Sequence, residues 1–294
     1  MPSLFTHLIL AEDLLESLPV GAGRHLLQAH REAYYLGALA PDLPYFDIFH
    51  RWKGLPLGHV IGPVTHAMET RVAAWLGWSL PAADGWAERL HSAGTLAVLR
   101  AWAAWARPHH GPLFAMVCGM LTHVAADEAL HPKVNQDSGA SPESAEGLRR
   151  HRQLEINLDY VLLRSRGVGL EGLKLEGLLE LYLGRVGQNN EFLDASLKAA
   201  WVEASQACGD PAPLGRGGLD GWSRGFSGAM RMLSHRLSPM EQQRQQFLRK
   251  GEEQWRTFFA REKYLSSHVP RAGRLGEALL TRVLAETSAL AGAR

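Results

Sequence analysis

The sequence contains little cysteine and little excess charge. Its 294 residues include two cysteines, Cys118 and Cys208, and both lie in apolar stretches with helical periodicity. Two such thiols do not form a disulfide framework, so small disulfide-stabilised folds are excluded and both are interpreted as reduced core residues. Lysine and arginine number 31 and aspartate and glutamate 30, which gives a net charge of +1. A chain without a basic field is not expected to hold nucleic acid in a stable complex.

Long hydrophobic runs are also missing. The first residues, "MPSLFTHLILAEDLLE", have no basic region and only a short apolar run, so they do not resemble a signal peptide. The apolar stretch 92–106 is interrupted by Arg100 and is too short to span a bilayer. Hydrophobic residues make up 46% and charged residues 21% of the chain, which is ordinary for a soluble globular protein. The sequence therefore predicts a cytoplasmic protein.

Alternation of apolar and polar residues with a period of two, which is typical of strands, is almost absent. Apolar residues recur with helical periodicity through most of the chain. The fold predicted is all-α, with one multi-helix domain over residues 1–210 and a C-terminal helical extension, 211–294, packed on the same domain. Pro132 predicts a helix end, because the residue before proline avoids helical angles. The helices are predicted at 7–19, 23–38, 64–78, 86–106, 112–131, 143–165, 171–185, 190–208, 217–236, 240–262 and 271–291.

One row of ligand-type side chains lies on the most apolar predicted helix, in "GMLTHVAADEALHP" (119–132). His123, Asp127 and His131 follow one another at intervals of four residues. At about 100° per residue, Asp127 lies within about 20° of Met120, which belongs to the apolar stripe of the helix. These polar groups are therefore expected to be buried, where an unpartnered charge is costly. A second pair, His151 and Glu155, shares a face of the helix predicted at 143–165.

Other histidines and carboxylates have ordinary explanations when each is taken alone. Asp42 follows Pro41 and suits a turn, while His7, His59 and His66 are single histidines of the kind that proteins often use structurally. Asp42 and His59 lie in an irregular segment, 40–63, that is longer than most structureless connections in compact domains. Together these groups suit Zn²⁺ and exceed what one tetrahedral ion needs. The motif H-E-x-x-H, an adjacent His-Asp pair and suitably placed E-x-x-H pairs are missing.

Taken in chain order, the histidines and carboxylates named above resemble the ligands of the zinc-dependent phospholipase C family. This family shares its all-α scaffold with P1/S1-type nucleases. The resemblance covers roughly residues 3–165. It is carried by the segments "THLILAE", "YYLGALAPDLPYFD", "GMLTHVAADEALHP" and "HRQLEINLD".

The resemblance implies two to three zinc ions and assigns a role to each ligand-type residue. The first ion would be held by His66, His123 and Asp127. The second would be held by His131, His151 and Glu155. The third would be held by His7, by Asp127 as a bridge, and by the amine and carbonyl of the chain's N-terminus. Asp42 would be both a metal ligand and the general base or water-orienting carboxylate.

This chain departs from the family pattern at two places. It starts Met-Pro-Ser, so removal of Met1 would leave the secondary amine of Pro2 as an alternative ligand. The stretch between Asp42 and His66 is longer than in the best-known members, so His59 is an alternative to His66. His66 is preferred because it opens a predicted helix.

The function predicted is zinc-dependent hydrolysis of a phosphodiester, with a phospholipid or another phosphodiester as substrate. Two alternatives remain: a P1/S1-like nuclease or soluble phosphodiesterase, and a metal-binding or scaffold protein without catalysis. Tyr45 and Phe46 either wall the pocket for a headgroup or pack within their loop. An amphipathic helix with Trp222 and Phe226 is expected to pack in the core; peripheral contact with a membrane and a lid over the site are its alternatives. The oligomeric state is not predicted.

Overall fold

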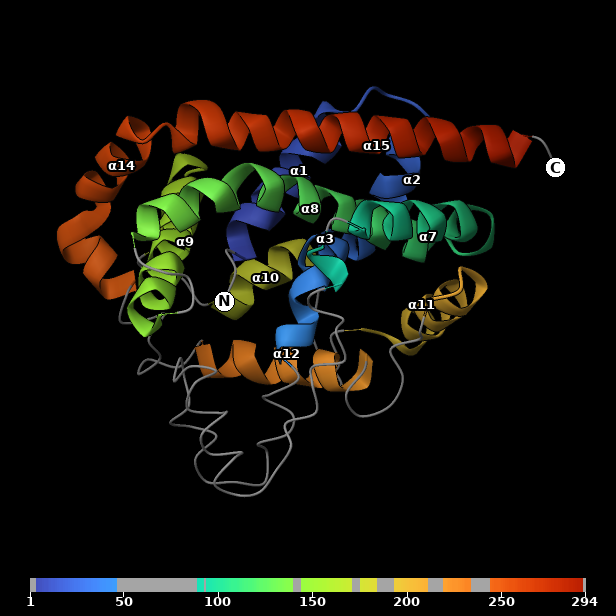
Figure 1. The fold of residues 1–294 in the computed structure, drawn as a ribbon, viewed down its shortest axis with the longest axis horizontal. Coiled ribbons are helices and arrows are strands. Elements are labelled where there is room, and N and C mark those ends of the chain that lie inside the picture. Colours follow the sequence, from blue (N-terminus) through green and yellow to red (C-terminus); the bar gives the residue numbers. More distant parts are fainter. Residues whose placement is uncertain are drawn as a thin grey trace, which may run out of the picture.

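The computed structural model describes residues 4–46, 89–92, 94–139, 144–170, 175–183, 193–210, 219–233 and 244–292. Within these ranges the protein is all-α and has no strand, as predicted (Figure 1). The elements, in chain order, are α1 (Leu4–Ser17), α2 (Ala22–Ala29), α3 (Arg31–Leu39), η1 (Ala40–Phe46), α7 (Thr95–His109), α8 (Gly111–Ser138), α9 (Ala145–Ser165), α10 (Leu175–Leu183), α11 (Ala195–Ala207), α12 (Leu219–Leu233), η3 (Phe247–Gly251), α14 (Glu252–Arg261), η4 (Tyr264–His268) and α15 (Val269–Gly292).

Helix α8 is the central element, and it contacts α1, α3, α7, α9 and α15 (Figure 1). The side chain of His110 accepts a hydrogen bond from the Leu113 amide at its start, and Gly139 ends it with a left-handed backbone (φ 68°). The helix is long and apolar enough to cross a membrane, but 83% of its most apolar window is buried inside the protein. We therefore interpret α8 as the core helix around which the others pack.

The prediction that a helix ends at Pro132 is wrong, because α8 continues through this proline to Ser138. A proline inside a helix removes one backbone hydrogen bond. Other contacts hold the last turns instead: Val134 is buried, Lys133 pairs with Asp137 of the same helix at 2.6 Å, and Lys133 also pairs with Glu262 of the C-terminal part of the chain at 3.3 Å. Packing against the C-terminal part of the chain thus outweighs the local effect of proline.

Helices α3 and α8 cross in backbone contact at two glycines. A Cβ atom added to Gly37 would lie 1.9 Å from the carbonyl oxygen of Met116, and one added to Gly119 would lie 1.9 Å from that of Tyr34. Because glycine has no Cβ, the two helices approach closely here. This crossing brings the end of α3, and η1 after it, beside the ligand-type residues of α8.

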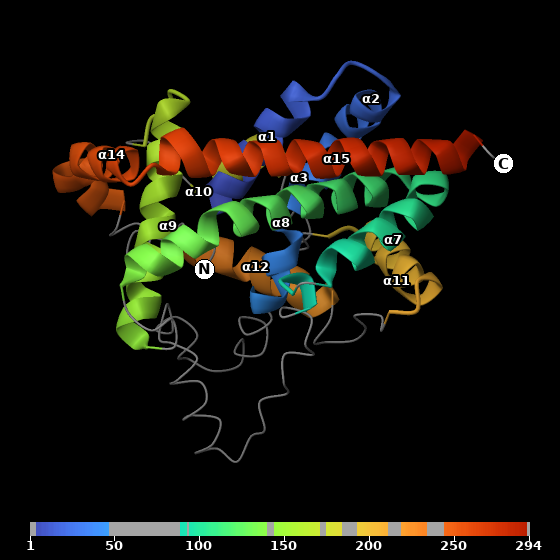
Figure 2. The same ribbon diagram turned by 45° about the horizontal axis from the view of Figure 1, so that its top comes forward.

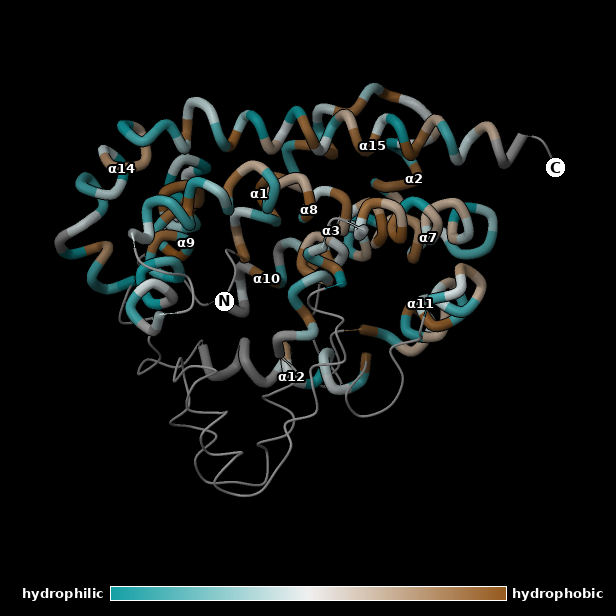
Figure 3. The backbone as a smooth tube through the Cα atoms, viewed as in Figure 1, coloured by the Kyte–Doolittle hydropathy of each residue, from teal (hydrophilic) through white to brown (hydrophobic). Residues whose placement is uncertain are grey.

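Helix α15 lies along α8 in both views (Figures 1 and 2) and also contacts α1 and α7. Its buried positions, among them Ala272, Leu280, Val283 and Thr287, follow helical spacing on one face. The outer side is polar, and the hydropathy of α15 accordingly alternates along its length (Figure 3). The boundary near residue 210 between a family-like domain and an extension stays a prediction.

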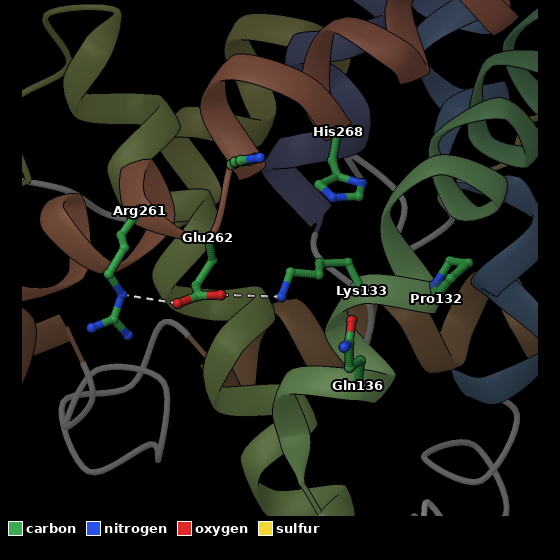
Figure 4. Close-up of a pocket in the computed structure, with 7 residues that line it drawn as sticks. Pro132, Lys133, Gln136, Arg261, Glu262 and His268 are labelled. Carbon is green, nitrogen blue, oxygen red and sulfur yellow. Dashed lines mark hydrogen bonds and ion pairs between the residues drawn. The ribbon is translucent and has the colours of Figure 1, made fainter.

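Helix η4 docks on the end of α8 through a polar network. The hydroxyl of buried Tyr264 donates to Asp137 at 2.8 Å, and Glu262 accepts from both Lys133 and Arg261 (Figure 4). A pocket opens beside these groups, next to His268. Lys133 follows His131 by two residues, so it points away from the ligand row of α8. We interpret this network as the contact that fixes η4 to the core.

Helix α12 packs against η1 (Figure 1). Trp222 is 2% and Phe226 0% exposed, so core packing is confirmed for these two side chains of the predicted amphipathic helix.

Candidate metal centre

Imidazoles and carboxylates from four helical elements and one turn meet at the middle of α8. They belong to α1, η1, the turn 89–92, α8 and α9. Three groups within this cluster bring their ligand atoms within 4.8 Å of one another: His7, Asp42 and His123; His91, His123 and Asp127; His131, His151 and Glu155.

Asp127 lies at the centre of the cluster. Its Oδ1 is 3.3 Å from His131 Nε2 and 3.5 Å from His7 Nε2. Its Oδ2 is 3.2 Å from His123 Nε2. The i, i+4 spacing of α8 thus places one imidazole on each side of a single carboxylate, and each oxygen faces different histidines. This arrangement suits a carboxylate that bridges two cations.

His123 is completely buried, and the end of α3 fixes its ring. Its Nδ1 donates to the carbonyl oxygen of Ala38 at 2.8 Å, so Nε2 faces the carboxylates. A metal-binding histidine commonly gives its other ring nitrogen to a carbonyl in this way, which sets its orientation and tautomer. The glycine crossing of α3 and α8 therefore helps to orient this imidazole.

His131, His151 and Glu155 form a second group where α8 passes α9. Glu155 Oε1 lies 2.9 Å from His151 Nε2 and 3.4 Å from His131 Nε2. Glu155 is 3% exposed, whereas the two imidazoles are partly exposed. The group is thus buried at Glu155 and partly exposed to solvent at its two imidazoles.

His7 comes from the first helix and is 3% exposed. Its ring stacks on that of His123, with centroids 3.9 Å apart and an interplanar angle of 12°. Two protonated imidazoles in this position would repel each other. Burial, followed by the neighbouring His123, lowers the pKa of His7 to about 3, so His7 is neutral at pH 7 and has a free lone pair for a cation.

The electrostatics of the other groups reflect their neighbours. Burial alone would lower the pKa of His123 and of His131. The carboxylates of Asp127 and Asp42 outweigh burial at both imidazoles, helped at His131 by Glu155, and raise both pKa values to about 9. Burial alone would raise the pKa of Glu155, but hydrogen bonds from His131 and His151 lower it to about 2. In the same way His123 holds the pKa of Asp127 well below its usual range. A cation bound at pH 7 must therefore displace protons from His123 and His131.

Sequence reasoning missed His91. Its Nε2 lies 3.4 Å from Asp42 Oδ1, 3.6 Å from Asp127 Oδ2 and 3.4 Å from His123 Nε2. The periodicity predicts one helix over 86–106, but the structure has a turn at His91 and Ser92, and α7 begins at Thr95. Ser92, two residues before Gly94, was the available signal for that break.

The structure brings together His7, Asp42, His123, Asp127, His131, His151 and Glu155 from the set predicted from the sequence. Other predicted positions lie outside the described residues: His66, His59, Pro2 and the side chains of Tyr45 and Phe46. Helix α1 starts at Leu4, so His7 lies just after its first residues.

The distances around Asp42 and His91 fit a metal better than they fit hydrogen bonds. A tetrahedral zinc ion with bonds of about 2.1 Å separates its ligand atoms by about 3.4 Å. Five contacts among His91, His123, Asp42 and Asp127 span 3.2–3.8 Å, near or beyond the upper end for good N–H···O bonds. His7 Nδ1, Asp42 Oδ2 and Asp127 Oδ1 are buried without a hydrogen-bond partner among the described residues. Buried polar atoms normally have partners, so these donor atoms fit zinc.

Comparison with protein families gave one match, to the family model described as zinc dependent phospholipase C, over residues 6–207. Comparison with curated proteins gave no match, and neither did comparison with solved structures. The matched residues contain every member of the cluster, from His7 in α1 to Glu155 in α9.

Proposed function

Since the chain belongs to the zinc-dependent phospholipase C family, we propose that it hydrolyses a phosphodiester bond of a phospholipid with a cluster of two to three zinc ions. The observation that carries the proposal is the position of Asp127, whose two oxygens face histidines on opposite sides. When bound, zinc polarises phosphoryl oxygens and lowers the pKa of water at its site.

The protein's own groups have distinct roles in this proposal. His131, His151 and Glu155 would hold one ion, and Asp127 lies between this site and the imidazoles of His7 and His123. Asp42 is 1% exposed and lies between His91 and His123, and its Oδ2 has no hydrogen-bond partner among the described residues. We assign to Asp42 the acceptance of a proton from the attacking water.

We also propose His91 as the metal ligand that completes the set of Asp42, His123 and Asp127. The distances of 3.4–3.6 Å from its Nε2 to these three residues support the assignment. The resemblance to the family favours His66 for this role, with His59 as the alternative, so the two assignments lead to different results.

We expect His91→Gln to lower the zinc content by about one equivalent per chain and His66→Gln to leave it unchanged, because glutamine replaces the imidazole nitrogen with a weaker ligand. Elemental analysis of the purified, dialysed proteins measures this directly. Loss of zinc from His66→Gln alone would return the role to His66. The exposed His109→Gln serves as a control for the loss of any histidine.

We expect Asp42→Asn to lower kcat by about a hundredfold or more, because it removes the proton acceptor and keeps the size of the side chain. The assay compares p-nitrophenyl-phosphocholine with bis-p-nitrophenyl phosphate and a single-stranded oligonucleotide. Asp13→Asn is the matched control, since that carboxylate belongs to a surface ion pair.

The three substrates separate the candidate activities. Preference for the phosphocholine ester supports the phospholipase reading, and equal use of both esters indicates a general phosphodiesterase. Preference for the oligonucleotide indicates a nuclease, which the net charge of +1 does not favour. A zinc-loaded protein that cleaves none of them is a binding protein, and an Asp42→Asn variant as active as the parent overturns the role assigned to Asp42.

A further inference from the structure

Helix α9 carries a second buried carboxylate, Asp159, one turn beyond Glu155. Asp159 is 1% exposed and lies against the first turn of α1. Its Oδ1 accepts hydrogen bonds from the Thr6 amide and the Thr6 hydroxyl, both at 2.7 Å, and its Oδ2 accepts one from the Phe5 amide at 3.2 Å. A single carboxylate from a distant helix thus binds two backbone amides at the start of α1.

These contacts pair free amides at the start of α1 and stabilise the buried charge of Asp159. The first four amides of a helix have no partner within the helix, and Asp159 satisfies two of those in α1. Two carboxylates at i and i+4 repel each other, and both Asp159 and Glu155 are buried. Asp159 is stabilised by the positive end of the α1 dipole, whereas Glu155 is stabilised by His131 and His151.

The residue next to Thr6 is His7, and its ring extends from this same turn to His123 and Asp127. Thr6 is completely buried, and its contact with Asp159 joins the helix that carries His7 to the helix that carries Glu155 and His151. The distance between His7 and the pair of His151 and Glu155 therefore depends on this contact.

We propose that Asp159 is a positioning residue: by binding the first turn of α1, it sets His7 at the distance from Asp127 that a shared metal requires. This inference rests on the proposed function and adds to it a residue that makes no contact with the metal. Loss of an outer contact of this kind usually weakens metal binding about 10–100-fold.

The test uses Co²⁺ as the metal, added to the full-length, metal-free protein, with the visible absorption of bound cobalt as the readout. Thr6→Val removes one hydrogen bond at nearly constant volume, and Thr6→Ser is the matched rescue variant because it keeps the hydroxyl. Asp159→Asn is the stronger change, because it replaces one of the two acceptor oxygens with an amide group and removes the negative charge. We expect Thr6→Val and Asp159→Asn to lower the cobalt affinity of the site that His7→Ala removes by about tenfold or more. Thr6→Ser should bind cobalt with an affinity close to that of the parent.

A merely structural role gives a different pattern. Val283→Ala, in the buried face of α15, lowers stability without touching the cluster, so it should leave the cobalt spectrum and affinity unchanged. Thr6→Val added to His7→Ala should have no further effect on cobalt binding, because both act on one site. Hydrogen exchange at the Phe5 and Thr6 amides should rise in Asp159→Asn.

The outcomes are distinguishable. If the parent and His7→Ala differ in cobalt binding but Thr6→Val and Asp159→Asn match the parent, the positioning role is overturned and the metal centre stands. If Val283→Ala weakens cobalt binding as much as Thr6→Val does, the effect is one of stability and the positioning role is again overturned. If the folded parent binds no cobalt or zinc, the proposed function fails and this inference fails with it.

Discussion

Asp127→Asn is expected to remove at least two metal equivalents and to abolish hydrolysis, because both of its oxygens face imidazoles of the cluster. Oδ1 lies near His7 and His131, and Oδ2 lies near His123. Asparagine keeps the volume but has one oxygen and no charge, so it cannot bridge two cations. The loss of activity should be larger than the decrease of about 10–100-fold that follows when a residue that only contacts a metal ligand is removed.

Removal of Asp127 also changes the protons held by its neighbours. The carboxylate is a main cause of the raised pKa of His123 and contributes to that of His131. Without it, the metal-free variant should hold fewer protons in the cluster, and both pKa values should fall from about 9 towards or below the ordinary value. A titration of the imidazoles by NMR in the metal-free protein measures this shift.

Glu128→Gln is the matched control for this prediction. Glu128 is the next residue of α8 and is exposed, so the substitution makes the same chemical change on the same helix outside the cluster. It should keep the metal content and the activity of the parent. Elemental analysis of both variants decides the matter: an Asp127→Asn protein that retains all its zinc would contradict the central place given to this carboxylate.

The ligand row of α8 could be predicted from the sequence because one helix generates it. His123, Asp127 and His131 are separated by four residues, and helical geometry alone places them on one face. The same holds for His151 and Glu155 on α9. Contacts between elements far apart in the chain had no such signal, so the amides of α1 that bind Asp159 could not be found, although Asp159 lies in a segment that carries the family resemblance.

His91 shows a different limit. Its surroundings have the periodicity of a helix, and the break before α7 depends on how a short turn packs. Asp210 accepts a hydrogen bond from Trp102 at 3.2 Å and pairs with Arg89, which fixes that turn beside α7. Pro132 is the converse case: its local preference to end a helix is clear, but the contacts of Tyr264 with Asp137 and of Glu262 with Lys133 override it.

Gly37→Ala and Gly119→Ala are each expected to destabilise the protein by about 3 kcal/mol or more, since overpacking a close contact commonly costs 1–3 kcal/mol and here the clash is with backbone. The added methyl group would lie 1.9 Å from a carbonyl oxygen of the facing helix, and neither helix can yield by a side-chain rotation. Relief requires that α3 and α8 move apart. That movement would break the hydrogen bond from His123 Nδ1 to Ala38, so metal affinity should fall together with stability.

Gly177→Ala separates this effect from the general consequence of replacing a helical glycine. Gly177 is exposed on α10, and a Cβ atom there would meet nothing within 4 Å. Alanine favours the helix by up to about 1 kcal/mol over glycine, so this variant should be as stable as the parent or more stable. Urea unfolding of the metal-free proteins compares the three variants. Stability within 1 kcal/mol of the parent for Gly37→Ala would show that α3 and α8 tolerate a wider separation, and His123 would then not depend on this crossing for its orientation.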